Sequence, residues 1–178
     1  MAHHGRGTRE GTIELITTYL EMRERPKLQV QGPHRGGMLL RLEEPSVTFY
    51  RYLYETIGGS YLWRERSGRR DDELTGLMLD PLLDVVVFFL GGAPAGFFEL
   101  ERRTPGEIRL VHFGLVPEFR GRGLGRWLLA FAIDMAWDHD PDRVWATITN
   151  VDDPRALLTY QWAGFAAVET RRETVATG

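Results

Sequence analysis

The sequence predicts a single α+β domain with a mixed, mostly antiparallel central sheet flanked by helices. Its 178 residues match the length of one ordinary domain, and no internal repeat or linker divides them. Three apolar, strand-like segments follow one another between residues 84 and 115, with tight turns between them. Segments with apolar residues at three- and four-residue spacing, typical of amphipathic helices, precede and follow these strands.

The N-terminal part predicts strands and two helices. Residues 12–22 are rich in β-branched and aromatic side chains and favour a first strand, and a short strand is expected at 38–42. A helix with an aromatic face is expected over 45–59, where a pair of glycines ends the apolar pattern. A shorter helix is expected over 70–79, because acidic residues lie near its positively polarised start.

The C-terminal part predicts a long helix, a strand, a short helix and a last strand. The long helix follows the glycine-rich segment 120–126, and a strand follows at 143–149. Asp153 is placed to cap the short helix, and residues 165–175 can add the last strand. The buried face of the long helix is expected to contain Leu124, Leu128, Phe131 and Met135.

Composition and charge narrow the class of function. The chain has no cysteine, which excludes disulfides and thiolate chemistry and fits a cytoplasmic location. A net charge of −3 gives no general attraction to nucleic acid, and no apolar stretch reaches the ~20 residues of a membrane helix. We therefore expect neither as a partner, and we expect no metal site because no spaced histidine pair is present. Residues 1–10 are polar and glycine-rich, which predicts a flexible tail before a single domain over 11–178.

A glycine-rich turn carries the strongest functional signal. Residues 120–126 (RGRGLGR) lie between a predicted strand and the long helix. Alternate glycines let backbone N–H groups converge on one point, and the helix N-terminus adds partial positive charge, so such a turn can bind a pyrophosphate. A Rossmann fingerprint is disfavoured because the third glycine comes one residue early, and a P-loop because G-K-[ST] is missing. A glycine-rich connection without a ligand is the remaining alternative.

Together with the later segment DPRALLTYQWAGF, the segment FGLVPEFRGRGLGRWLL resembles the GNAT superfamily of acyl-CoA-dependent N-acetyltransferases. The resemblance covers residues 84–166 in the family's order and spacing, and earlier only as a layout of one strand followed by two helices. It implies a GNAT-like domain with acetyl-CoA as co-substrate. The backbone of the turn would hold the pyrophosphate, and the preceding strand would pair with the pantetheine arm. The implied cofactor-binding residues are Phe113, Gly114, Leu115, Arg120, Gly121, Arg122, Gly123, Leu124, Gly125 and Arg126.

The resemblance also assigns a general acid. Tyr160 stands at the family's tyrosine position, where the hydroxyl can protonate the departing CoA thiolate. Where many family members have asparagine at the start of this helix, the chain has Asp153, which cannot donate an amide hydrogen bond to the cofactor arm. Asn150 is an alternative donor for that contact.

A base must also remove a proton from the attacking amine. The candidates are Glu99, Glu101, Glu107 and His112. Glu99 is preferred because its apolar neighbours would raise its pKa toward neutrality by desolvation. A structural ion pair with a strand arginine such as Arg109 is the alternative for this carboxylate, and His112, Glu101 or an ordered water are the alternative bases.

These features predict an N-acetyltransferase that moves an acetyl group from acetyl-CoA to a primary amine of a small molecule or peptide by direct attack. A catalytically silent acyl-CoA-binding or regulatory module is the alternative, and Tyr160 favours the enzyme. Tyr52 and Trp63 are candidates to line the acceptor cleft, whereas Tyr50 and Tyr54 fit core packing. A homodimer is among the expected assemblies, because exposed edge strands favour pairing between copies.

Overall fold

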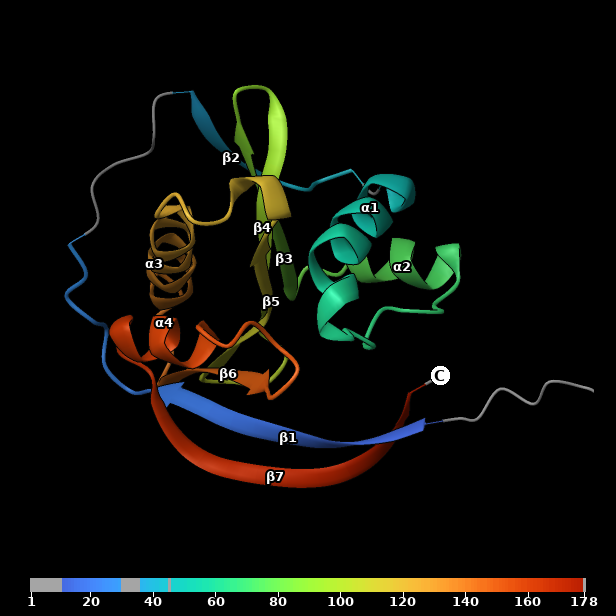
Figure 1. Cartoon of the computed structure of the whole chain (residues 1–178). Coiled ribbons are helices and arrows are strands. Elements are labelled where there is room, and N and C mark those ends of the chain that lie inside the picture. The colour runs from blue at the N-terminus through green and yellow to red at the C-terminus, as the bar shows by residue number, and fades with distance from the viewer. Residues whose placement is uncertain (1–10, 30–35, 45, 178) are drawn as a thin grey trace, which may run out of the picture.

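A seven-stranded sheet organises the part of the chain that the computed structural model describes, residues 11–29, 36–44 and 46–177 (Figure 1). The strands are β1 Gly11–Met22, β2 Gly37–Arg41, β3 Leu83–Leu90, β4 Ala93–Glu101, β5 Glu107–Leu115, β6 Arg143–Thr149 and β7 Ala166–Thr177. They lie in the order β2-β3-β4-β5-β6-β1-β7. Only β5 and β6 run parallel, which confirms the predicted mixed, mostly antiparallel sheet. The tail expected over residues 1–10 lies outside the described residues.

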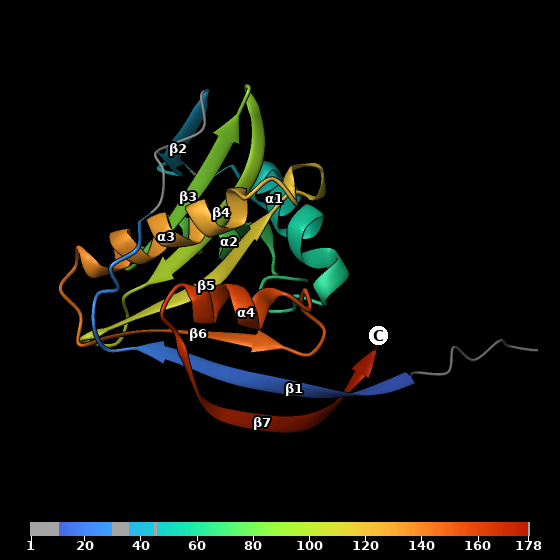
Figure 2. The same cartoon turned by 60° about the vertical axis from the view of Figure 1, so that its left-hand side comes forward.

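Helices cover both faces of the sheet. They are α1 Val47–Gly58, α2 Asp71–Met78, α3 Leu124–Trp137 and α4 Ala156–Trp162, with short 3-10 turns at η1 Gly59–Tyr61 and η2 Pro117–Phe119. One side of the sheet carries α1 and α2, and the other carries α3 and α4 (Figures 1 and 2). Ser46 begins α1 because its hydroxyl accepts the Phe49 N–H at 3.4 Å. The helices expected over 45–59 and 70–79 are confirmed.

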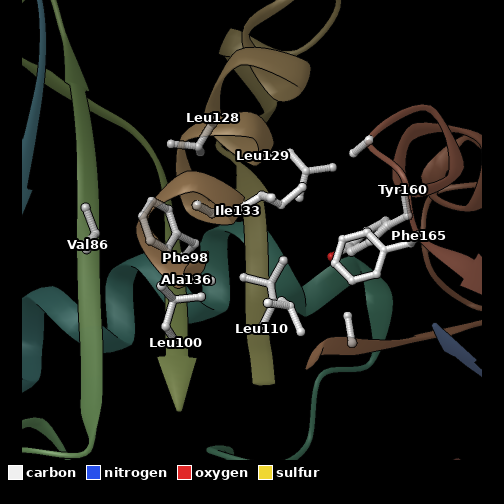
Figure 3. Packing of buried hydrophobic residues seen from close by; sticks show 14 of the residues in the cluster. Val86, Phe98, Leu100, Leu110, Leu128, Leu129, Ile133, Ala136, Tyr160 and Phe165 are labelled. Atoms are coloured by element: carbon white, nitrogen blue, oxygen red, sulfur yellow. The ribbon is translucent and has the colours of Figure 1, made fainter. Parts of the chain in front are cut away.

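The central strands bury apolar side chains on both faces, which explains why their sequences are continuously hydrophobic. The core on the α3 side includes Val86, Phe98, Leu100, Leu128 and Ile133 (Figure 3). The core on the α1 side includes Val85, Val87, Phe97, Leu53 and Ile57. Tyr50 and Tyr54 also lie in the second core, as expected from their spacing.

The buried face of α3 differs from the prediction in part. Leu124 and Leu128 are buried, but Phe131 is 40 % exposed and Met135 is only half-buried. Almost every residue of this helix is apolar, so three- and four-residue spacing fits more than one stripe. The buried residues of the helix are Leu124, Trp127, Leu128, Leu129, Ala130, Ala132, Ile133 and Ala136.

The N-terminal strand β1 lies at the opposite end of the sheet from the strand that leads into α1. It is inserted between β6 and β7 and pairs Thr17 with Thr149 and Leu15 with Glu173 (Figure 1). The short strand expected at 38–42 is confirmed as β2, which comes between β1 and α1 and pairs with β3.

A β-bulge in β5 shapes the centre of the sheet. Glu99 of β4 pairs with His112, but the next residue of β4 pairs with Leu110, so Val111 is an extra residue. Alternation is shifted across this residue: Leu110 points into the α3 core, whereas His112 points to the other face, beside Glu99. The parallel pairing of β5 with β6 also ends at Leu110. The two strands therefore separate at the bulge.

Close packing of α1 on β5 gives a test of the fold. A Cβ built on Gly114 would clash with Cγ2 of the fully buried Ile57, so Gly114→Ala forces the helix to move. We expect the free energy of unfolding to fall by about 1–3 kcal/mol in a urea titration. Gly76→Ala in α2 meets no atom within 4 Å and serves as the control. A Gly114→Ala variant as stable as the control would contradict this packing.

Candidate active site

A cleft of about 580 Å³ lies between the separated ends of β5 and β6 and the starts of α3 and α4. We call it the strand cleft. It brings together most of the residues that sequence reasoning selected. They are Phe113, Gly114, Leu115, Arg120, Gly121, Gly123, Gly125, Arg126 and Tyr160. Two of the selected cofactor-binding residues lie outside it: Leu124 is buried in the core, and the Arg122 guanidinium lies over the Phe119 ring at 5.4 Å.

The glycine-rich turn has the geometry of an anion site. Gly121 and Gly123 adopt left-handed φ angles of +75° and +76°, and α3 begins directly after Gly123 without a side-chain cap. Unpaired N–H groups of the first helical turn therefore border the cleft. Arg120 donates from Nε to the Leu115 carbonyl at 3.2 Å, and its Nη2 is buried without a protein partner. A buried cationic donor beside a helix N-terminus fits a phosphate group.

The exposed backbone of β5 forms one wall of the strand cleft. Val116 donates its N–H to the Ala95 carbonyl, toward β4. N–H groups alternate in direction along an extended strand, so those of Phe113 and Leu115 point the other way, into the gap left by β6. This edge can pair with an extended molecule that carries amide groups.

Tyr160 lies on α4 beside this wall. Its ring is 7 % exposed and packs edge-on against Phe113 at 6.2 Å and Phe165 at 5.3 Å. Burial raises the pKa of Tyr160, and the negative charge of Asp152 raises it further. The hydroxyl therefore stays protonated at neutral pH and can donate a proton.

A second cavity of about 550 Å³ lies on the α1 side of β5, β6, β1 and β7. We call it the acceptor cavity. Its wall includes Leu15, Thr17, Tyr19, Arg109, His112, Trp145 and Glu173. The residues that border both cavities are Tyr61, Trp63, Val111, Thr147 and Asp152. The two cavities thus meet at the bulged residue of β5.

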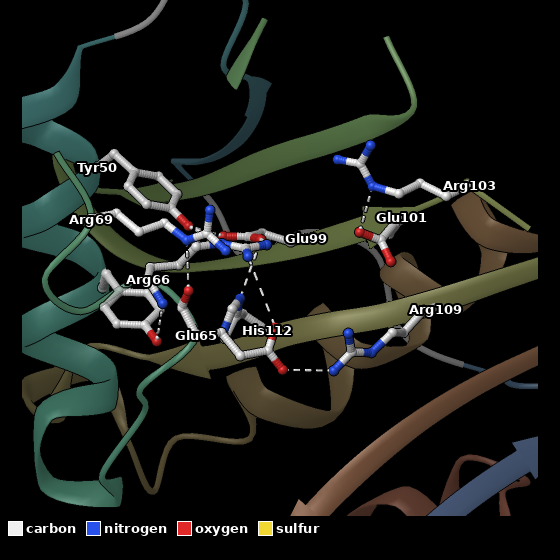
Figure 4. Close-up of polar contacts among 10 residues, drawn as sticks. Tyr50, Glu65, Arg66, Arg69, Glu99, Glu101, Arg103, Arg109 and His112 are labelled. Carbon is white, nitrogen blue, oxygen red and sulfur yellow. Dashed lines mark hydrogen bonds and ion pairs between the residues drawn. The ribbon is translucent and has the colours of Figure 1, made fainter. Parts of the chain in front are cut away.

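Glu99 is enclosed in a polar cluster next to the acceptor cavity (Figure 4). Its side chain is fully buried and borders neither cavity. The Tyr50 hydroxyl donates to one carboxylate oxygen, and Arg66 Nη2 donates to the other at 3.0 Å. His112 Nδ1 lies 3.2 Å from that second oxygen. Tyr54 completes the cluster by accepting the Arg66 backbone N–H at 3.1 Å.

The expected rise in the pKa of Glu99 is wrong. Burial alone would raise it, but the charges of His112 and Arg66 and the Tyr50 hydrogen bond outweigh burial and lower the pKa to about 2. An enclosed carboxylate of such low basicity is a poor proton acceptor. The alternative of a structural ion pair holds, with Arg66 as partner, because Arg109 instead pairs with Glu65 at 2.7 Å.

The other proposed bases and cleft residues fall into two groups. Glu101 pairs with Arg103 at 2.9 Å and borders neither cavity, and Glu107 likewise lies outside them. Tyr52 is 44 % exposed on α1 and also borders neither, whereas Trp63 borders both. Among the candidate bases, only His112 reaches the acceptor cavity.

At the start of α4 the structure differs from two expectations from the sequence, which concern Asp153 as the helix cap and Asn150 as a donor to the cofactor arm. The helix begins at Ala156 with Arg155 at its cap, so Asp153 lies one turn earlier and accepts the Arg155 N–H at 2.9 Å. Asp153 borders the strand cleft. Asn150 does not, because its side chain accepts the Ile16 N–H at 2.8 Å and donates to the Glu14 carbonyl at 3.0 Å. It extends the pairing of β6 with β1 and is not free to bind a cofactor arm.

Three polar residues of the site were not singled out from the sequence: Glu65, Arg66 and Asp152. Arg66 stands in an arginine-rich loop, RERSGRR, where nothing local distinguishes it from its neighbours. Asp152 precedes the expected capping residue and is fixed by the backbone N–H and hydroxyl of Thr149 at 2.6 and 2.9 Å. Its position between the two cavities depends on how β6 and α4 meet.

The separated parallel strands, the glycine-rich helix start and the buried tyrosine define an acyltransferase of the GNAT type. The family model described as the acetyltransferase (GNAT) family matches residues 44–165, and the chain belongs to this family. The family reaction is acetyl transfer, generally with acetyl-CoA as co-substrate. A comparison with curated proteins finds no match.

Solved structures show the same fold. An aminoglycoside acetyltransferase from an uncultured soil metagenomic sample, crystallised with trehalose, is 16 % identical, with a TM-score of 0.61 over 76 % of this chain and 91 % of its own. A GCN5-related N-acetyltransferase from Kribbella flavida is 18 % identical, with a TM-score of 0.62 over 93 % of this chain. Another from Sphaerobacter thermophilus is 15 % identical, with a TM-score of 0.67 over 91 % of this chain. This chain spans 60 % and 51 % of the length of the latter two.

Two further observations concern the described residues alone. No helix within them is long and apolar enough to cross a membrane. No group of three or more histidine or acidic side chains in the same part of the chain is arranged to hold a metal ion.

The left-handed turn can be tested with a matched pair of glycines. Gly123 and Gly92 have φ angles of +76° and +84°, and a Cβ on either meets nothing within 4 Å. Alanine at each position therefore costs similar backbone strain, about 1–2 kcal/mol. Gly123→Ala should weaken CoA binding by about tenfold, because shifted N–H groups lose charge-assisted hydrogen bonds, whereas Gly92→Ala should not. Isothermal titration with CoA measures both, and equal affinities would show that the turn is only structural.

Proposed function

We propose that this protein transfers the acetyl group of acetyl-CoA to a primary amine of a small molecule or peptide by direct attack. One observation carries the proposal: the strand cleft and the acceptor cavity meet at Val111, with Tyr160 bordering the first and His112 the second. A thioester entering along β5 and an amine entering from β1 would reach the same point from opposite sides.

The strand cleft suits the co-substrate in three parts. The turn at Gly121 and Gly123, with Arg120, offers donors for the pyrophosphate. The N–H groups of Phe113 and Leu115 offer an edge for the amide groups of pantetheine. Tyr160 then lies where the thioester sulfur would arrive.

Direct attack requires little from the protein besides position and proton transfer. An alkylamine has a pKa of about 10 and is mostly protonated at neutral pH, so it must lose a proton before it attacks the carbonyl carbon. The C–N bond then forms, the C–S bond breaks, and the Tyr160 hydroxyl gives its proton to the thiolate. The backbone N–H groups at the end of β5 are the candidate donors to the carbonyl oxygen.

Acidic residues in the acceptor cavity favour a cationic acceptor. Asp152 borders both cavities, and only its Oδ2 is hydrogen-bonded within the described residues, which leaves Oδ1 for an ammonium group. Glu173 lies in the wall of the same cavity. The predicted cytoplasmic location and homodimer stay predictions from the sequence.

A screen with acetyl-CoA tests the proposal. Putrescine, kanamycin and a lysine-containing peptide represent a small diamine, an aminoglycoside and a peptide amine, and thiol release reports turnover. We expect CoA release with at least one of them. Tight CoA binding without turnover on any amine would instead support the silent acyl-CoA-binding module.

The role of Tyr160 can be separated from cofactor binding. Tyr160→Phe removes one hydroxyl and almost no volume, so we expect turnover to fall by about 10²-fold while CoA affinity changes little. Tyr52→Phe, on the exposed face of α1, is the matched control. Full turnover by Tyr160→Phe on the best of the three amines would show that Tyr160 is not the acid.

A further inference from the structure

The bulge in β5 places one titratable ring against the acceptor cavity. Leu110 points into the α3 core, and regular alternation would send His112 to the same face. The extra residue Val111 turns His112 to the opposite face, where its ring borders the acceptor cavity and is 6 % exposed. Val111 itself stands where the two cavities meet. The bulge thus brings the imidazole close to the point of reaction.

The imidazole of His112 packs against Glu99 and two aromatic rings. Its buried Nδ1 lies 3.2 Å from Oε2 of the fully buried Glu99, within ion-pair distance although not aligned as a hydrogen bond, and this leaves Nε2 as the nitrogen for the cavity. Rings of Tyr54 and Trp63 lie against it at centroid distances of 5.1 and 4.7 Å. The imidazole therefore has little freedom to turn.

Glu99 is itself fixed by an ion pair and by a further hydrogen bond. Arg66 and the Tyr50 hydroxyl hold its two oxygens, and Arg66 Nε also donates to the Tyr50 oxygen at 3.2 Å. The charge of Arg66 and the Tyr50 hydrogen bond both lower the pKa of Glu99, so they favour the charged carboxylate also when the imidazole is neutral. A fixed negative charge behind Nδ1 favours a proton on that nitrogen and stabilises the imidazolium when Nε2 takes up a second one.

We propose that His112 is the general base that deprotonates the acceptor amine and that Glu99 is its positioning residue, an inference that rests on the proposed function. His112 Nε2 takes one proton from the ammonium group and releases it to solvent after turnover. The free amine nitrogen attacks the thioester carbon, and its second proton passes to solvent as the amide forms. Tyr160 recovers from solvent the proton that it gives to the thiolate.

Other charged and titratable groups surround this imidazole. Those packed on it, linked to it through Glu99 or sharing its cavity are Glu99, Arg66, Tyr50, Tyr54, Glu65, Arg64, Arg109, Tyr19, Tyr61, Asp152 and Glu173. Glu65 is neutralised by Arg109, and Glu99 by Arg66, so Asp152 and Glu173 are the remaining negative charges in the described wall of this cavity and Arg64 is the remaining positive one, and of the three only Asp152 also borders the strand cleft. Asp152 attracts the ammonium group, and His112 removes its proton.

Three variants test the assignment on the fastest acceptor among putrescine, kanamycin and the lysine peptide. His112→Gln should lower kcat/KM by about 10²–10⁴-fold and remove the acidic limb of the pH profile that protonation of His112 causes. Glu99→Gln should lower kcat/KM by about tenfold or more, because the imidazole loses the carboxylate that fixes its tautomer and orientation. Asp84→Asn is the matched control: Asp84 is 1 % exposed and paired with Arg102, but it borders neither cavity.

The outcomes separate the parts of the proposal. Wild-type kcat/KM and an unchanged acidic limb in His112→Gln would overturn the base. A lost limb in His112→Gln together with wild-type kcat/KM in Glu99→Gln would overturn only the role of Glu99. An equal loss in Asp84→Asn would show that any broken buried ion pair has this effect, and would also overturn the role of Glu99. A wild-type protein that turns over none of the three amines contradicts the proposed function itself.

Nitrogen NMR of the imidazole rings tests the pairing of His112 with Glu99 directly, without an acceptor amine. The His112 signals are those that disappear in His112→Gln. In the wild-type protein the neutral ring should carry its proton on Nδ1, facing Glu99, and this preference should be lost in Glu99→Gln but kept in Asp84→Asn. A wild-type ring protonated on Nε2 would overturn the positioning role whether or not the protein acetylates an amine.

Discussion

The arrangement of the site depends on one break in regular hydrogen bonding, the extra residue Val111 in β5. A bulge bends its strand and interrupts the ladder, and here the parallel pairing with β6 ends immediately before it. The gap exposes N–H groups of β5 on one side and opens a passage between two cavities. Without the bulge, β5 and β6 would be able to continue side by side, and His112 would face the α3 core.

The polar cluster next to the bulge holds a buried charged carboxylate, Glu99, and its partners offset the cost of burying that charge. A buried carboxylate is costly unless it is paired and hydrogen-bonded, and Glu99 receives both from Arg66 and Tyr50. The partners come from α1, from the loop before α2 and from β5, so the cluster also fixes how α1 packs on the sheet. Loss of Glu99 would leave Arg66 buried without its partner, which is why a second buried pair is the appropriate comparison.

Sequence patterns predicted the features that depend on neighbouring residues. The strand meander, the aromatic helix α1 and the glycine-rich start of α3 all follow from local spacing, and each is present. The features that sequence reasoning missed depend on distant contacts. Glu99 was assigned a raised pKa because its neighbours in sequence are apolar, but His112, Arg66 and Tyr50, which are all distant in sequence, reverse the shift. The place of β1 between β6 and β7 and the reversed direction of His112 likewise have no local signal.

Amide hydrogen exchange with and without CoA tests the central claim most directly, because it reads the edge of β5 residue by residue. In the free protein the N–H groups of Phe113 and Leu115 face the open cleft. Saturating CoA should slow their exchange strongly, while Gly91 and Gly92 in the β3–β4 turn keep their rates. Unchanged exchange at Phe113 and Leu115 under saturating CoA would contradict the account, since the pantetheine arm would then not lie along the strand that the bulge exposes.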